Sequence, residues 1–207
     1  MVTSGAVPGS ILAVFAHPDD AELWAGATLA LHARYAVVTV VIPHRDDVRG
    51  AEARKGAAAL GADLRQVPRL DHATVQQQLL EAQPEIVITH PLGDVHPEHR
   101  AVAATVLVAV PEPRIATGRP TRFYTCDTYS SLTLDGPVRA DVIVDATATF
   151  DAKMAALREH ASQPIEQHFG PMAEALGRLW GPRIGTRYAE AFTSVPILGC
   201  LPGATHL

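Results

Sequence analysis

The sequence has little cysteine, few aromatic residues and no long apolar run, and each shortage excludes a class of protein. Two cysteines, Cys126 and Cys200, are too few for a disulfide framework or a thiolate metal site, and they favour a reducing, cytoplasmic setting. No run approaches the roughly 18 apolar residues of a membrane span, so we expect no membrane partner. Residues 1–10 lack the basic start of an export signal.

Basic residues are also scarce and scattered. There are 17 against 22 acidic residues, a net charge of -5 with no basic cluster, which argues against a nucleic-acid partner. The apolar share of 47%, with 19% charged residues, is that of a globular protein with a core. We expect one domain over 1–207, with a less regular C-terminal elaboration from about residue 111.

Short apolar runs alternate with helix-forming segments in the first half of the chain. Strands are expected at 11–16, 36–42, 63–67 and 85–89, and helices at 21–33, 49–60, 74–82 and 97–110. This alternation predicts a Rossmann-like α/β fold, with a mostly parallel sheet and helices on both faces. The second half is less regular, with strands expected at 121–128 and 141–145, a helix at 149–161, a loop at 111–120 and irregular connections before 188–192.

A polar segment with metal-ligand residue types follows the first expected strand directly. It contains His17, Asp19 and Asp20. Imidazole and carboxylate are ligands that Zn²⁺ accepts, and catalytic zinc typically has three protein ligands. Neighbouring residues in an extended turn point in different directions, so one aspartate could bind metal while the other acts as general base. The alternative, in which Asp20 caps the following helix and His17 is incidental, stays open at this point.

A second polar segment follows the strand expected at 85–89. Pro97 suits the first position of a helix, which places His96 at the cap and His99 in the first turn. A single metal could take either histidine and leave the other to contact substrate. Taken alone, the segment fits a polar helix start with two solvated histidines. Ligands of parallel α/β sheets bind beyond the carboxyl ends of the strands, so two such segments at that edge favour a shared metal site.

Motifs for other chemistries are missing from the sequence. It has no Gly-x-Ser-x-Gly elbow, no Gly-x-Gly-x-x-Gly after the first strand and no Gly-Lys-Ser/Thr loop. A serine hydrolase, a dinucleotide site and a nucleoside-triphosphate site are therefore disfavoured. His44 and Arg45, after the second strand, fit either a pocket lining or a solvated loop.

On these residues the sequence resembles the LmbE/PIG-L-like family of zinc-dependent N-deacetylases, which remove acetyl groups from N-acetylglucosamine-type amino sugars. The resemblance spans nearly the whole chain. Its matching positions are 16–22 with Gly26 and 28–30, Arg49 with Glu52, 60–61, 89–91, Asp94 with 96–100, Asp145, Lys153, His160 with 162–163, and 188–190 with Phe192.

The resemblance implies one zinc ion per chain, held by His17, Asp20 and His99. It also implies that Asp19 is the general base and that His96 stabilises the oxyanion. The substrate implied is a small N-acetylated sugar or glycoside, hydrolysed to a free amine and acetate. A homo-oligomer is compatible with the resemblance.

Further residues carry supporting roles by the same resemblance. Arg49 would contact the sugar, and Asp94 and Glu98 would support the histidines. Some sugar deacetylases of the family have a tyrosine at the position of Asp94, and Glu98 stands where aspartate is commoner.

Comparison with the family pattern puts three more residues at the expected substrate pocket. Trp24, where small residues are usual, would alter the pocket rim or fill the core. His44 replaces part of the family's Thr-x-Gly pattern, and His160 would line the pocket or support it. Glu190 is expected to be a buried partner of Arg187 or Arg183.

Two other functions remain compatible with the sequence. One is a zinc amidase acting on a different amide, such as a thiol-sugar conjugate. The other is a non-catalytic sugar-binding relative. Such a relative would be expected to lose Asp19 or a metal ligand, and this sequence keeps them all.

Overall fold

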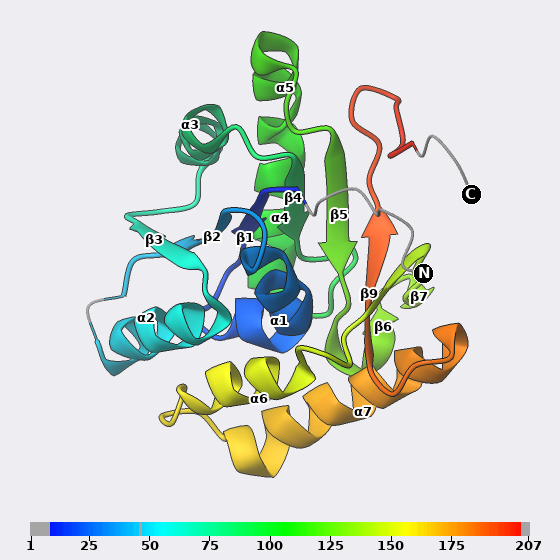
Figure 1. Cartoon of the computed structure of the whole chain (residues 1–207). Coiled ribbons are helices and arrows are strands. Elements are labelled where there is room, and N and C mark those ends of the chain that lie inside the picture. The colour runs from blue at the N-terminus through cyan, green and yellow to red at the C-terminus, as the bar shows by residue number, and fades with distance from the viewer. Residues whose placement is uncertain (1–8, 46, 204–207) are drawn as a thin grey trace.

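A seven-stranded sheet forms the centre of the computed structural model, which describes residues 9–45 and 47–203 (Figure 1). The strand order is β3-β2-β1-β4-β5-β9-β8. The strands are β1 Ile11–Val14, β2 Val38–Pro43, β3 Asp63–Val67, β4 Ile86–Thr89, β5 Arg122–Cys126, β8 Val142–Asp145 and β9 Ala189–Ser194. Strands β1 to β5 are parallel, and β9 is antiparallel to both β5 and β8. The predicted Rossmann-like, mostly parallel α/β fold is confirmed.

Helices cover both faces of the sheet (Figure 1). One group is α1 Asp20–Ala33, α2 Val48–Leu60, α6 Phe150–Arg158 and α7 Gly170–Trp180; the other is α3 His72–Ala82, α4 Pro97–Ala109 and α5 Pro111–Thr117. Alternation along β1 explains the two layers, because Ile11 and Ala13 join the core under the first group while Leu12 and Val14 join the core under the second. A small hairpin, β6 Leu132–Thr133 with β7 Gly136–Pro137, and the short helices η1 Tyr129–Ser131, η2 Ile165–Phe169 and η3 Gly181–Ile184 complete the described chain.

Two helices differ from the sequence expectation. Residues 111–117 form α5 where a loop was predicted, because Pro111 stands at the first turn, where proline is tolerated, and Gly118 ends the helix with φ 76°. Helix α7 lies in a region expected to be irregular, and its buried residues Ala173, Leu176, Gly177 and Trp180 have amphipathic helical spacing. The Gly61 C-cap has the left-handed conformation typical of glycine, with φ 74°.

The sheet order brings the two polar loops together. Strand β1 pairs with β2 on one side and with β4 on the other. The connections that follow β1 and β4 therefore run to opposite faces of the sheet. The loops after β1 and β4 therefore meet at the carboxyl edge, where parallel α/β proteins bind ligands. The expectation that residues 1–10 are not an export signal concerns a segment that lies mostly outside the described residues, because residues 1–8 are not described; Asp46 is not described either. Among the helices of the described ranges, none is long and apolar enough to cross a membrane.

Candidate metal centre and active site

Two helix starts place the predicted ligands. Pro97 begins α4, and His96 caps it by accepting the Glu98 backbone N–H at its Nδ1, 3.2 Å away. Asp20 begins α1, but its carboxylate Oδ2 accepts the backbone N–H of His17 at 2.7 Å and so closes the loop before the helix. The carboxylate of Asp20 therefore closes the loop and makes no helix-capping hydrogen bond.

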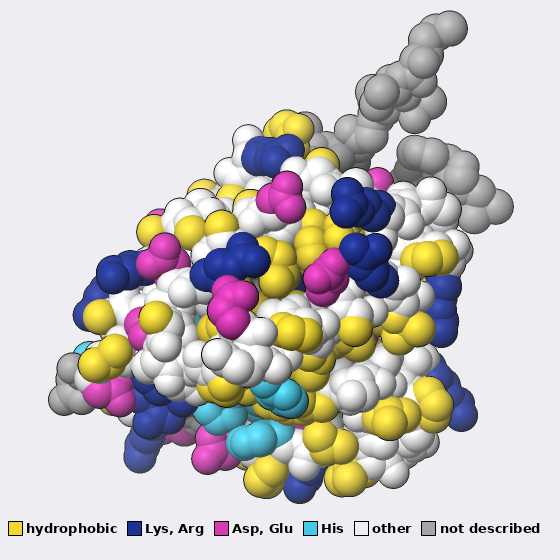
Figure 2. Space-filling view, turned by 90° about the horizontal axis from the view of Figure 1, so that it is seen from below, with side chains coloured by type: hydrophobic (Ala, Val, Ile, Leu, Met, Phe, Trp, Pro, Cys, Tyr) yellow, Lys and Arg dark blue, Asp and Glu magenta, His cyan; other side chains and the backbone are white. Residues whose placement is uncertain are grey.

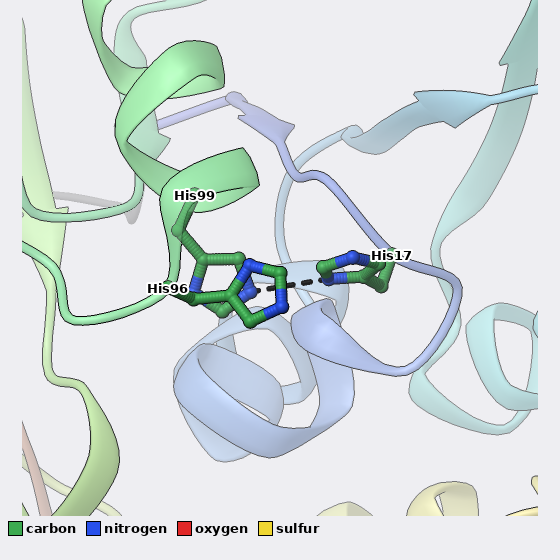
Figure 3. A group of neighbouring side chains, drawn as sticks. All are labelled: His17, His96 and His99. Carbon is green, nitrogen blue, oxygen red and sulfur yellow. Dashed lines mark hydrogen bonds between the residues drawn. The ribbon is translucent and has the colours of Figure 1, made fainter.

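The imidazoles of His17, His96 and His99 lie beside one another, from the β1 loop and the start of α4 (Figure 3). The His17 Nδ1 atom is 3.1 Å from His99 Nε2. Asp20 Oδ2 is 3.2 Å from His17 Nδ1, and Asp20 Oδ1 is 3.4 Å from His99 Nε2. Donor atoms of a tetrahedral zinc site with bonds of about 2.0–2.1 Å are separated by about 3.3 Å. Each of the three distances is close to this value, although Asp20 contacts His17 through Oδ2 and His99 through Oδ1.

His17 and His99 each have a carboxylate on the other ring nitrogen. His17 Nε2 is 2.7 Å from Glu98 Oε2, and His99 Nδ1 is 3.1 Å from Asp94 Oδ2. In the neutral rings, an N–H on each of those nitrogens would leave the lone pair on His17 Nδ1 and on His99 Nε2, the two atoms that face each other. A carboxylate behind the imidazole is the usual outer partner of a metal-bound histidine.

Two overlapping groups of three residues each bring one donor atom per residue within 4.8 Å of the others: His17 with His96 and His99, and Asp20 with His90 and His99. His90 is a poor ligand because its ring stacks face to face on His99, with centroids 3.8 Å apart, so the lone pairs in the two ring planes do not converge. Its Nε2 also accepts the Ala16 backbone N–H at 3.1 Å. His99 is common to both groups, and His17 and Asp20 contact it directly.

The electrostatics of the cluster favour a cation. Burial opposes ionisation of Asp20, but His90, His17 and His99 outweigh burial and hold the pKa of its carboxyl well below the usual range. Burial likewise opposes protonation of His99, but hydrogen bonds to Asp20 and Asp94 raise its pKa to about 9. The carboxylates of Asp20 and Asp94 thus attract positive charge, a proton or a metal ion, to the imidazoles beside them.

Asp19 lies next to this cluster and pairs with Arg49. The Arg49 Nη2 atom donates to Asp19 Oδ1 at 2.8 Å. The pKa of the Asp19 carboxyl is raised, first by burial and then by the charge of Asp20, and Arg49 offsets part of this shift. Asp19 stands at the N-cap position of α1 without making a side-chain cap hydrogen bond, so the helix does not occupy its second oxygen.

A cavity of about 180 Å³ opens over these groups and is lined by His17, Asp19, Asp20, Leu23, Arg49, His96, Tyr129, Gln163 and Phe169. Figure 2 shows histidines gathered on the face seen from below, beside acidic and hydrophobic side chains. Neither Tyr129 nor Phe169 was predicted from the sequence, because both come from segments without a readable pattern. Tyr129 is followed by Ser130 and Ser131 at φ 52° and 56°, a backbone conformation that non-glycine residues adopt at a cost and that often occurs at functional sites.

Tyr129, which lines this cavity, is a neutral side chain. Burial, with the nearby charges of Asp20 and Asp19, raises its pKa to about 12. Thr128 anchors the segment by donating its hydroxyl to Asp94 Oδ2 at 2.8 Å. The loop after β5 is therefore fastened to the same carboxylate that holds His99.

Three residues expected at the substrate pocket, Trp24, His44 and His160, are not among those that line this cavity. The side chains of Trp24 and His160 are 2% and 0% exposed, so neither contacts a ligand in the cavity. Trp24 donates its indole N–H to Asp20 Oδ1 at 3.1 Å, and His160 Nε2 is 3.5 Å from Glu22 Oε2. His44 is exposed and is not among the residues that line the cavity. The buried positions of Trp24 and His160 agree with the alternatives of core filling and support, and substrate contact by His44 stays a prediction.

The expected partner of Glu190 was also wrong. Its carboxylate pairs with Lys153 Nζ at 2.6 Å and accepts the backbone N–H groups of Ala27 and Thr28. Arg187 and Arg183 instead stack on aromatic rings, those of Tyr188 and Trp180. The buried pair ties α1, α6 and β9 together behind the candidate site.

Comparison with known proteins supports the fold. No protein-family model matches the sequence. The conserved protein TT1542 from Thermus thermophilus has 25% sequence identity and a TM-score of 0.74, over 90% of this chain and 95% of that chain. N,N'-diacetylchitobiose deacetylase from Pyrococcus horikoshii, solved with its inhibitor MPG, has 20% identity and a TM-score of 0.70, over 90% and 84%. The A40926 pseudoaglycone deacetylase Dbv21 has 20% identity and a TM-score of 0.70, over 90% and 96%. The chain therefore shares its α/β fold with proteins that include two named deacetylases.

Proposed function

We propose that this protein is a zinc-dependent hydrolase that removes an N-acetyl group from a small amino sugar or its glycoside, producing a free amine and acetate. The observation that carries the proposal is the pair of facing ring nitrogens, His17 Nδ1 and His99 Nε2, 3.1 Å apart, with the Asp20 carboxylate beside both. The named activities of two fold neighbours agree with it. The cavity volume of about 180 Å³ is below the roughly 300–1,000 Å³ of sites for drug-sized ligands, which favours a small group.

The residues present fit a zinc ion, because two imidazoles and a carboxylate are donors that it prefers and their contacts of 3.1–3.4 Å are close to tetrahedral spacing. His17, Asp20 and His99 would hold it through Nδ1, a carboxylate oxygen and Nε2. A bound zinc ion supplies Lewis-acid chemistry, since it polarises a carbonyl group and acidifies water. His96 remains outside this set and faces the same cavity.

Asp19 is the proposed general base. Arg49 occupies its Oδ1 atom, so Oδ2 is the oxygen that accepts a proton from the attacking water. The raised pKa of the Asp19 carboxyl makes it a better proton acceptor than an exposed aspartate. The same proton is then available for the amine that leaves when the C–N bond breaks, with His96 as the other donor in reach of the cavity.

His96 is the proposed oxyanion partner. Its Nδ1 accepts the Glu98 N–H, which places the proton of the neutral ring on Nε2. Burial, together with the charges of His99 and His17, lowers the pKa of His96 and so favours its neutral ring. The Nε2–H group can therefore donate to a carbonyl oxygen as negative charge develops there.

The decisive experiment combines metal analysis with acetate release. We expect one zinc per chain, and acetate from N-acetylglucosamine, its glycosides or diacetylchitobiose. Activity should be lost with a chelator and restored by zinc. No bound metal after zinc loading would refute the site. Metal binding without acetate from any sugar, but with cleavage of a larger thiol-sugar conjugate, would assign the same centre to a different amide.

A further inference from the structure

Trp24 contacts the candidate metal centre from behind. It lies one helical turn after Asp20 on α1, the helix drawn below the imidazoles in Figure 3, so the two side chains share a face of the helix. The indole Nε1 donates to Asp20 Oδ1 at 3.1 Å, and the side chain is 2% exposed. The ring also packs edge-on against Tyr129 at 5.0 Å and against His99 at 6.4 Å between centroids.

The indole completes the support of the Asp20 carboxylate. Oδ2 is held by the backbone N–H of His17 at 2.7 Å, and Oδ1 by Trp24. Two N–H donors on different oxygens of one carboxylate fix its rotation. Without the indole, one of these hydrogen bonds would remain, and Oδ1 would keep only His99, 3.4 Å away. Asp20 is 3% exposed, so water has little room to replace the lost donor.

Trp180 shows which part of this arrangement is specific. It is the chain's second tryptophan, is also 2% exposed, and donates its indole N–H to a buried carboxylate, Asp127, at 2.6 Å. Buried indoles usually find a hydrogen-bond acceptor, so the bond alone indicates no function. The two indoles differ in the aspartate that accepts their hydrogen bond. Asp20 contacts the imidazoles of His17, His90 and His99. The other hydrogen-bond partners of Asp127 are Thr128 and Ser131.

We propose that Trp24 is a positioning residue, which fixes the carboxylate of Asp20 in the orientation that binds the metal. This inference rests on the proposed zinc site. It gives a metal-related role to a bulky residue that the sequence pattern had placed at the pocket rim or in the core. Replacing an outer-shell hydrogen-bond partner typically weakens metal affinity by roughly 10- to 100-fold.

The test compares Trp24→Phe with Trp180→Phe, a matched pair because each removes one buried indole N–H from an aspartate. Zinc affinity of the metal-free proteins is measured by competition with a chromogenic chelator, after circular dichroism shows that each variant is folded. We expect Trp24→Phe to bind zinc about 10- to 100-fold more weakly, and Trp180→Phe to bind it as tightly as the unmodified protein. Equal affinity of Trp24→Phe and the unmodified protein overturns the proposal. Unmodified protein that binds no zinc overturns the proposed function as well.

Fluorescence supplies a second measurement that does not require Trp24→Phe to fold. In Trp180→Phe, Trp24 is the only tryptophan, so the emission reports on the indole beside Asp20. We expect zinc to shift this emission with the midpoint found by chelator competition. Emission that stays constant while zinc binds would show that the indole does not sense the site, and the positioning role would be wrong.

Discussion

Asp94 and Glu98 offer a matched pair for testing how the protein holds its histidines. Each carboxylate contacts one histidine of the proposed site, but Asp94 is completely buried whereas the side chain of Glu98 is 64% exposed. The same chemical change, Asp94→Asn and Glu98→Gln, should therefore have different effects. We expect zinc affinity to fall by roughly 10- to 100-fold in Asp94→Asn, and by less than about 5-fold in Glu98→Gln, because exposed ion pairs contribute only about 0.2–1 kcal/mol.

The hydrogen bonds of Asp94 explain the larger effect. Its Oδ1 accepts the His96 backbone N–H at 2.7 Å, while its Oδ2 accepts from His99 Nδ1 at 3.1 Å and from the Thr128 hydroxyl at 2.8 Å. An asparagine has one oxygen and one NH₂ group. In either orientation the NH₂ group faces a donor, the His96 N–H or the His99 N–H, and a buried donor without an acceptor is costly.

The assay is zinc competition against a chromogenic chelator, with the melting temperature of each variant as a control for folding. Asp94→Asn should remain folded at the assay temperature and still lose affinity. The reasoning fails if Glu98→Gln weakens zinc binding as much as Asp94→Asn does, because burial would then not decide the strength of these contacts. It also fails if Asp94→Asn binds zinc within about 5-fold of the unmodified protein, the range expected for an exposed pair.

Three further variants or treatments test other parts of the structure. Asp19→Ala should retain zinc but lose about 10²- to 10⁴-fold in acetate release, the usual contribution of a general base; near-normal turnover would exclude that role. Lys153→Met leaves Glu190 as an uncompensated buried charge, so the free energy of unfolding measured in urea should fall by about 3–5 kcal/mol. Adding Glu190→Gln should recover part of this loss, and a double variant no more stable than Lys153→Met would contradict the reasoning. In native protein only the thiol of Cys200 should react with Ellman's reagent, because Cys126 is fully buried and burial raises the pKa of its thiol well above the usual range. Both thiols should react after denaturation, and a rapid reaction of both in native protein would contradict the burial of Cys126.

The parallel part of the fold was predictable because its signals are local. Each of β1, β2 and β4 is a short apolar run bounded by polar residues, and this pattern is typical of strands buried on both faces. Helices α5 and α7 were not predicted, since prolines and glycines at their starts resemble loop signals. In both helices proline occupies the first turn, where the missing N–H has no helical partner to lose.

The candidate site was predictable where its residues follow a strand and not where they depend on distant contacts. The facing of His17 and His99 required only that the loops after β1 and β4 be neighbours, which the β1–β4 pairing provides. Tyr129 had no such signal, because a segment after β5 places it in the cavity through the contact of Thr128 with Asp94. Such a contact joins residues 34 positions apart, and no local pattern specifies it.

Trp24 illustrates the limit most clearly. Its spacing of four residues from Asp20 was visible in the sequence, and on a helix that spacing puts two side chains on one face. Whether an indole at that position fills the core or supports a ligand depends on what the carboxylate contacts on its other side. Those contacts come from His17, His90 and His99, and the last two lie far along the chain. The positioning role therefore becomes visible only in three dimensions, and the Trp24→Phe and Trp180→Phe pair tests it directly, because the two indoles are equally buried and only one supports a carboxylate among histidines.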